Sequence, residues 1–326
     1  MRIKSKVARI FFPCLALRLG WRLHPSARLK FIRPARDWVQ DIRLEGPVEH
    51  LIHPKLLERR VAIHLVGVGG NGAQMAACLA RLDIAMRALG HPLGLHVTAF
   101  DADRVSEANV GRQLYSAADI GRHKALVTIH RLNQFYGLDW EAHPMRYEEF
   151  VLGHRYAANA DLLVSCVDSR SARQVLHRLA WQDAHRYGYW LDLGNTESTA
   201  QVVLGEPQGG AASGQGPRLP CVTELFPELL DESAPEDNQP SCSVRMSLAS
   251  QGLFINDVVV RYAAQLLYEL FSKGRLSAHG VLVNLESKRS GPIEVDSRTW
   301  MRFGFSHQDA GCPQPGLEAN GEDCVP

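Results

Sequence analysis

The chain has 326 residues, enough for one large domain or two small ones, and its 45% hydrophobic and 22% charged residues are ordinary for a folded water-soluble protein. No run of about 18 apolar residues occurs, so a membrane-spanning helix and a membrane partner are not expected. The net charge of +1 hides an asymmetry, because residues 1–45 hold 11 Lys and Arg against 3 Asp and Glu, a net +8 that leaves −7 for the remainder.

The basic N-terminal extension, residues 1–45, has two interpretations. Its charge would suit contact with nucleic acid or an anionic surface, and the alternative is a solvated arm. An amphipathic helix is predicted at about residues 7–19. Arg9, Pro13 and Arg18 interrupt its apolar residues, so no secretion signal is predicted.

Seven cysteines are scattered along the chain, at positions 14, 78, 166, 221, 242, 312 and 324. Their odd number and the absence of a C-x-x-C pair indicate neither a disulfide framework nor a zinc module. We therefore expect a protein of the reducing cytoplasm.

Strands and helices alternate along the body of the chain. The apolar run "VAIHLVG" predicts a strand over residues 61–67, and apolar residues at three- and four-residue steps predict a helix over residues 71–89. By the same criteria, further strands are expected at 95–103, 139–147, 160–169 and 189–195, and further helices at 121–137 and 169–188. This alternation predicts the α/β class, with a doubly wound, mostly parallel, Rossmann-like sheet in a domain of residues 46–300.

The later part of the chain departs from this alternation. A strand at 199–205 follows its predecessor closely and is expected to be antiparallel. Gly, Pro, Ser and acids dominate residues 205–246, which predicts a long mobile crossover. The remaining expectations are a long apolar helix at 247–272, a closing hairpin at 280–287 and 292–296, and a polar, disordered tail at 301–326.

The loop after the first strand carries four glycines. Gly67, Gly69 and Gly72 fit G-x-G-x-x-G, a fingerprint of dinucleotide binding, and Gly70 adds a fourth glycine. Glycines let the backbone approach a phosphate, and the amides that open the next helix attract the anion. The fingerprint alone does not distinguish NAD, FAD and other nucleotides, and a purely structural turn is the alternative.

Polar residues cluster after the second strand, in "FDADRVSEANVGRQLYS" and on the helix that follows. Asp101 ends the strand, where a carboxylate can bind ribose hydroxyls. Cations and amides near a phosphate loop favour polyphosphate chemistry over hydride transfer. The alternative is a solvated polar loop. The clustered residues are Asp101, Asp103, Asn109, Arg112, Gln113 and Lys124.

Asp168 follows the apolar strand "LLVSCV". A carboxylate at this strand end can hold Mg²⁺ through one or two contacts. It can also cap the helix that opens at Ser169 or Arg170, and the two roles are compatible. Because strands of a parallel sheet end on one edge, we expect Asp168 to share a site with Asp101 and the glycine loop.

Together, "GVGGNGA", "DADRVSEANVGRQ", the spacing to Lys124 and "SCVDSRSAR" resemble the ThiF/MoeB/HesA group of E1-like activating enzymes. The resemblance spans about residues 55–272. The stretches "EANVGRQL", "HKALVTIHRLNQFYGLDWEA", "ELFPEL" and "LFIN" are further similar to the ThiF family of PRTRC gene clusters. Members of the group use Mg-ATP to adenylate the C-terminal glycine of a ubiquitin-like protein. The resemblance therefore implies that this chain is an ATP-dependent adenylating enzyme.

The resemblance also implies roles and partners. The glycines would cradle ATP phosphates, Asp101 would bind the ribose, and Asp168 would bind Mg²⁺. Catalysis would involve Arg112, Lys124 and Asp168, with a thioester step on Cys242 in the crossover. The implied ATP-binding set is Gly67, Gly69, Gly70, Gly72, Asp101, Asp103, Asn109, Arg112, Gln113 and Lys124. The implied partners are a β-grasp protein ending in Gly, an E2-like protein, a JAB-type peptidase and a second copy of this chain.

Three departures from the family pattern stand out. Glu224 occupies the place of a cysteine that would pair with Cys221, so structural zinc is not expected. Arg59 and Arg60 lack the usual pattern of an arginine that reaches a partner subunit's ATP. Ser169 replaces the usual asparagine after the metal-binding acid.

The thioester step and the function itself each have alternatives. Cys221 is a second candidate nucleophile, whereas Cys166 lies within a strand and is expected in the core. For the whole protein, the alternatives are a relative of the same fold that activates a small carboxylate or a modified RNA base, an NAD- or FAD-dependent oxidoreductase, and a nucleotide-binding scaffold without catalysis.

Overall fold

A computed structural model describes residues 48–154, 159–182, 186–207, 214–231, 233 and 252–306. The chain divides into two units, residues 1–45 and residues 46–326. The expected basic extension lies outside the described residues, and everything below concerns the second unit.

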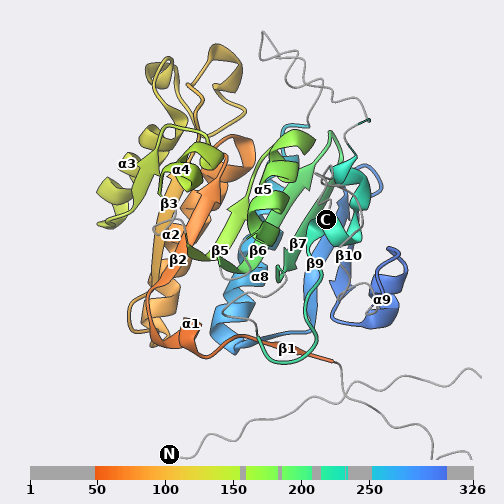
Figure 1. Cartoon of the computed structure of the whole chain (residues 1–326). Coiled ribbons are helices and arrows are strands. Elements are labelled where there is room, and N and C mark those ends of the chain that lie inside the picture. The colour runs from red at the N-terminus through yellow and green to blue at the C-terminus, as the bar shows by residue number, and fades with distance from the viewer. Residues whose placement is uncertain are drawn as a thin grey trace, which may run out of the picture. The chain divides into compact units, whose positions relative to one another are not determined.

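An eight-stranded sheet forms the centre of this unit, in the order β10-β9-β7-β6-β5-β2-β3-β4 (Figure 1). Five strands pair in parallel: β2 (Val61–Val66), β3 (Leu95–Phe100), β4 (Glu141–His143), β5 (Ala160–Ser165) and β6 (Tyr187–Asn195). Three antiparallel strands extend the sheet: β7 (Thr199–Gly205), β9 (Ala278–Asn284) and β10 (Arg289–Glu294). The predicted α/β class with a mostly parallel, Rossmann-like sheet is confirmed, as is the antiparallel β7.

Helices cover both faces of the sheet, with α5 in front of it and α8 behind it in Figure 1. One layer contains α2 (Gly70–Ala88), α3 (Lys124–Tyr136) and α8 (Ile255–Lys273), and the other contains α4 (Tyr147–Gly153) and α5 (Arg170–Gln182). Shorter elements are α1 (Lys55–Glu58), α6 (Val222–Leu225), α9 (Ser297–Met301) and the 3-10 turns η1 (Glu107–Asn109), η2 (Ala117–Asp119) and η3 (Pro227–Leu230). A small second sheet pairs β1 (His50–Leu51) with β8 (Arg275–Leu276). Within the described ranges, no helix has both the length and the apolar character needed to cross a membrane.

The apolar runs of the sequence explain the central strands. Every residue of β5 is buried, and β2 and β3 are each buried at all but one position. Such continuous burial is typical of parallel strands that are covered by helices on both faces. The edge strand β4 is much shorter than the predicted strand 139–147. Pro144 follows it without an N–H to donate, and α4 begins at Tyr147.

Part of the crossover is folded, which corrects the expectation of a mobile segment over residues 205–246. Residues 214–231 include α6 and η3, and the Arg218 guanidinium binds both carboxylate oxygens of Glu224, at 2.6 and 3.0 Å. Phe226 packs edge-on against Phe303, with ring centroids 5.4 Å apart. The tail expected from residue 301 therefore begins inside the domain and is packed as far as Phe305, which is 6% exposed.

A buried ion pair holds α5 on the sheet. The Arg173 guanidinium lies 3.1 Å from the Asp192 carboxylate of β6, and neither side chain is more than 6% exposed. Ser165 of β5 donates to the same carboxylate at 2.6 Å, and the Trp190 indole donates to Ser165. Arg173 also donates to the Val167 carbonyl at 2.8 Å, so it fixes the turn between β5 and α5.

Replacing Arg173 by leucine should lower the free energy of unfolding by about 3–5 kcal/mol, because the Asp192 charge would remain buried without its partner. Urea denaturation measures this loss. The control Arg178→Leu, on the exposed side of α5, should change stability by no more than about 0.5 kcal/mol. Equal losses in the two variants would contradict the importance of the buried pair.

Candidate functional site

The turn between β2 and α2 needs two of its glycines for its own geometry. Gly67 has φ +85°, and a Cβ there would lie 2.7 Å from the Cys166 carbonyl oxygen of the neighbouring strand end. A Cβ on Gly72 would overlap the Gly67 carbonyl. A side chain at either position would therefore push apart the loop or the strands, whatever ligand is bound.

The other two glycines lie where α2 begins. Gly69 is the N-cap of α2, and a Cβ on it would meet the Gln113 amide nitrogen at an ordinary 3.8 Å. A Cβ on Gly70 would overlap the Asn256 side chain of α8. The first amides of this 19-residue helix have no carbonyl partner within the helix, and the helix dipole adds positive potential there. The turn has the chemistry of an anion site.

Asp101 fastens the glycine loop to the end of β3. Its Oδ2 accepts a hydrogen bond from the Val68 N–H at 2.6 Å, and its Oδ1 accepts one from the Asp103 N–H at 2.8 Å. Burial raises the pKa of the Asp101 carboxyl, whereas the Lys124 charge and these two N–H groups lower it. The carboxylate has further lone pairs, so it can also accept from the hydroxyls of a sugar.

Lys124 and Tyr115 secure the polar segment from the side of α3. The Lys124 ammonium, 9% exposed, lies 2.9 Å from the Asp103 carboxylate, and its backbone N–H donates to the Asp103 carbonyl. The Tyr115 hydroxyl donates to the Val68 carbonyl at 2.6 Å and lies 3.1 Å from the Thr128 hydroxyl. Sequence analysis did not single out Tyr115, although it stands two residues after Gln113.

Asn109 and Gln113 lie within the same segment and are both buried. The Asn109 side-chain oxygen accepts from the Ser106 N–H at 2.9 Å and from the Ser106 hydroxyl, which caps η1. The Gln113 N–H donates to the Asn109 carbonyl, and its side chain lies beside Gly69. Asn109 shapes the segment, while Gln113 borders the anion site.

Arg112 and Asp168 come close enough for their charges to interact across the site. Burial lowers the pKa of the partly buried Arg112 guanidinium, and the negative charge of Asp168 raises it. Asp168 is exposed after β5, and the helix cap is Ser169, whose hydroxyl accepts from the Ala172 N–H at 3.2 Å. The Asp168 carboxylate is therefore not needed to cap α5.

All predicted site residues that the structure describes lie at the carboxyl edge of the sheet, as expected, although their individual roles remain predictions. Cys242 lies outside the described residues. Within those residues, no group of three or more His, Cys, Asp or Glu side chains is arranged to hold a metal ion. Mg²⁺ needs only one or two protein carboxylates when phosphates complete its shell, so Asp168 suits this ion.

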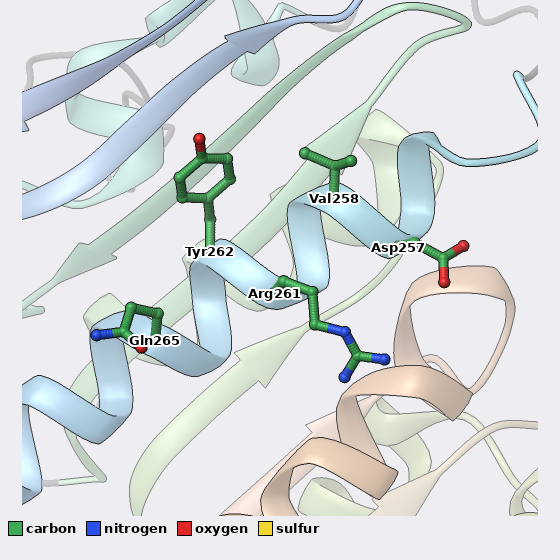
Figure 2. Close-up of a pocket in the computed structure, with 5 residues that line it drawn as sticks. All are labelled: Asp257, Val258, Arg261, Tyr262 and Gln265. Carbon is green, nitrogen blue, oxygen red and sulfur yellow. The ribbon is translucent and has the colours of Figure 1, made fainter.

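A separate hollow of about 440 Å³ runs along α8, lined by Asp257, Val258, Arg261, Tyr262 and Gln265 (Figure 2). All five belong to one helix, and none is a predicted site residue. Asp257 and Arg261 bind α2, through Gln74 at 3.3 Å and the Cys78 sulfur at 2.7 Å. This hollow is distinct from the anion site.

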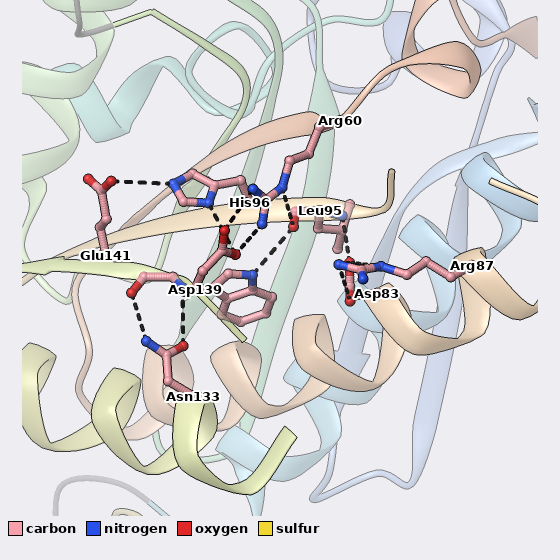
Figure 3. Close-up of polar contacts among 9 residues, drawn as sticks. Arg60, Asp83, Arg87, Leu95, His96, Asn133, Asp139 and Glu141 are labelled. Atoms are coloured by element: carbon pink, nitrogen blue, oxygen red, sulfur yellow. Dashed lines mark hydrogen bonds and ion pairs between the residues drawn. The ribbon is translucent and has the colours of Figure 1, made fainter. Parts of the chain in front are cut away.

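Arg59 and Arg60 lie at the amino edge of the sheet, opposite the glycine loop, because they directly precede β2. Arg59 forms a two-pronged ion pair with Asp161, and Arg60 does so with Asp139. Figure 3 shows Arg60 and His96 around Asp139, with Arg60 also donating to the Leu95 carbonyl. Both arginines therefore form ion pairs with aspartates at the strand ends of their own chain.

The described cysteines are all buried: Cys78, Cys166 and Cys221. Burial raises the pKa of each thiol. The Cys221 N–H donates to the Glu224 carboxylate at 2.8 Å, and Glu224 binds Arg218. Glu224, which occupies the position of a cysteine in the family pattern, is thus part of an ion pair with Arg218.

Residues 49–297 match the family model described as "ThiF family". Similar solved structures include PaaA (16% identity, TM-score 0.46, 73% of this chain and 65% of that chain) and E. coli MccB with ATP (14%, 0.47, 73% and 64%). The E. coli tRNA N6-threonylcarbamoyladenosine dehydratase TcdA aligns over 37% of this chain and 48% of its own, at 22% identity and a TM-score of 0.31. The chain thus spans less than two thirds of each of these relatives. Among curated proteins, none matches it.

Replacing Tyr115 by phenylalanine should loosen the glycine loop, because the buried Val68 carbonyl would lose its donor. We expect the free energy of unfolding to fall by about 1–2 kcal/mol and hydrogen exchange to accelerate at residues 68–72. The control Tyr136→Phe alters a partly buried tyrosine whose hydroxyl has no partner among the described residues. Unchanged exchange in Tyr115→Phe would contradict the anchoring role.

Proposed function

The chain belongs to the ThiF family, and from that premise we propose that it is an E1-like enzyme that uses Mg-ATP to adenylate a protein carboxylate. The proposed substrate is the C-terminal glycine of a small ubiquitin-like protein. The observation that carries the proposal is the placement of Asp101, the glycine loop and the exposed Asp168 at the carboxyl ends of the neighbouring strands β3, β2 and β5. The amides of α2 lie at the same edge of the sheet.

The residues fit a metal-bound triphosphate. Asp168 offers the exposed carboxylate that Mg²⁺ requires, and Arg112 and Lys124 offer positive charge for phosphate oxygens. Asp101 lies one strand away from the glycine loop, where it can accept from ribose hydroxyls. A site for hydride transfer would instead need a flat slot for the nicotinamide ring. The charged side chains gathered here do not favour binding of such a ring.

The reaction needs little acid–base help, because a carboxylate is already ionised at neutral pH. Its oxygen attacks the α-phosphorus, the bond from that phosphorus to the bridging oxygen breaks, and pyrophosphate leaves. Bound Mg²⁺ would neutralise charge on the leaving group. Arg112 and Lys124 would stabilise charge on the phosphoryl oxygens, while the glycine loop and Asp101 orient the nucleotide. Lys124 would then share its charge between Asp103 and the nucleotide.

Isotope exchange between ATP and pyrophosphate tests the proposal. Exchange should require a Gly-ended ubiquitin-like protein, and Asp168→Ala should slow it by about 100-fold or more. The control Asp139→Ala removes an exposed carboxylate at the opposite edge of the sheet and should leave exchange unchanged. Reduction of NAD or FAD without any exchange would favour the oxidoreductase, and nucleotide binding without turnover would favour the inactive scaffold.

We extend the proposal to a thioester on Cys242 and to partners. The three described cysteines are poor nucleophiles, because burial favours the protonated thiol over the reactive thiolate. Cys242, in the crossover, is the candidate that the sequence favours. The similarity to PRTRC clusters supports a ubiquitin-like substrate, an E2-like acceptor, a JAB-type peptidase and a homodimeric enzyme as proposals of the same kind.

Under ATP, a thiol-sensitive adduct between the enzyme and the modifier should form and should disappear in Cys242→Ser. The matched variant Cys221→Ala should retain the adduct, because the Cys221 thiol is buried and protonated. Non-reducing gels and mass spectrometry measure both. An adduct that survives in Cys242→Ser but not in Cys221→Ala would overturn the assignment.

A further inference from the structure

The strand order arranges the candidate site along one edge. Asp101 follows β3, the glycine loop follows β2, Asp168 follows β5, and Asn195 ends β6, the next strand along. If the nucleotide spans the first three positions, as the proposed function requires, then the fourth lies on the side away from the ribose. Asn195 and its neighbours are placed to meet the second substrate.

Three asparagines from three elements lie around the first turn of α2, and we call them the asparagine cluster: Asn71 of α2, Asn195 of β6 and Asn256 of α8. Asn71 donates through Nδ2 to the Asn195 side-chain oxygen at 2.8 Å. The Asn256 side chain lies so close to Gly70 that a Cβ there would overlap it. The cluster therefore borders the first turn of α2, where the phosphates are proposed to bind.

The hydrogen bonds define which way the Asn71 amide points. Asn195 donates through Nδ2 to the Thr196 carbonyl at 3.1 Å. A carbonyl oxygen only accepts, so Asn195 must turn its own side-chain oxygen toward Asn71. Asn71 must then present its nitrogen to Asn195. This leaves Asn71 Oδ1 buried, with no partner among the described residues.

A buried acceptor without a donor is costly and marks a place where a ligand can supply one. Asn71 is 9% exposed, so most of this side chain, including Oδ1, is buried while the residue still reaches the edge of the site. Phosphates and the reacting carboxylate carry no hydrogen-bond donors at neutral pH. The ribose hydroxyls are assigned to Asp101, which follows β3, whereas Asn195 ends β6, three strands away in the sheet. The remaining donors near the reaction are the backbone N–H groups of the substrate tail and water on the metal ion.

We propose that the asparagine cluster is the subsite for the extended peptide tail that carries the reacting carboxylate. Asn71 Oδ1 accepts a hydrogen bond from a backbone N–H within the last three residues of that tail. This inference rests on the proposed function. It assigns Asn71 a specificity role for a peptide carboxylate over a small carboxylic acid, because only a peptide presents such an N–H.

The test pairs a change in the enzyme with a change in the substrate. The probe is a ten-residue peptide ending in Gly-Gly, with each of its last three N–H groups replaced in turn by an ester oxygen. In wild type, one ester should raise the KM for the peptide about tenfold in ATP–pyrophosphate exchange. Asn71→Leu should show a similar rise with the parent peptide and no further rise with that ester. The KM for ATP should stay within about twofold in all cases.

Asn195→Ala removes the hydrogen-bond partner of Asn71 and leaves Asn71 Oδ1 in place. In this variant, the ester should therefore still raise the KM for the peptide. Gln265→Leu, on the exposed side of α8, is the matched control and should behave as wild type. Should Asn71→Leu fail to fold, Asn71→Ala serves the same comparison, because it also removes the acceptor. Undiminished ester sensitivity in the Asn71 variants, or altered Mg²⁺ dependence with an unchanged peptide KM, overturns the inference but not the proposed function. If neither the peptide nor its fusion to a β-grasp protein supports exchange in wild type, the proposed function fails, and the inference with it.

Discussion

The carboxylate of Asp101 is the interaction on which the site depends. Its two oxygens accept from Val68 in the glycine loop and from Asp103 in the polar segment, at 2.6 and 2.8 Å. Burial opposes its ionisation, and the N–H groups together with Lys124 favour it. Val68 is held on its other side by Tyr115. These hydrogen bonds and the Lys124–Asp103 ion pair connect the loop, the end of β3 and the start of α3.

A second group of contacts holds the other half of the site, and the sheet joins it to the first, because the Cys166 N–H donates to the Val66 carbonyl at 2.8 Å. The Arg173–Asp192 pair fixes α5 to β6, and its bond to the Val167 carbonyl fixes the turn that carries Asp168. The Asp168 charge, in the second group, raises the pKa of Arg112, in the first. A ligand that binds at both strand ends would contact both groups.

The sequence predicts best those helices and strands that form because of their own residues rather than because of distant contacts. The strand at residues 61–67 and its neighbours are apolar runs. A continuous apolar run is the sequence pattern typical of a parallel strand covered by helices on both faces. The crossover 205–246 is predicted to be mobile because Gly, Pro, Ser and acids dominate it. Residues 214–231 are nevertheless ordered by contacts that composition does not show: Glu224 binds Arg218 within the segment, and Phe226 packs against the distant Phe303. The same limit applies to the site. Asp101 and Asp168 could be placed from strand ends alone, but the hydrogen bond from the Tyr115 hydroxyl to the Val68 carbonyl requires the folded chain.

The glycine fingerprint itself divides into two kinds of position. Gly67 and Gly72 are required by the turn, since a Cβ at either would strike the backbone, and this requirement is the same for any nucleotide. Between them, the Val68 side chain is fully buried and Gly70 lies under Asn256. Asn71 is the one polar side chain within the six-residue motif. The glycines can thus explain why a nucleotide binds at this turn, whereas discrimination between second substrates must come from the variable positions and from the strand ends beside them.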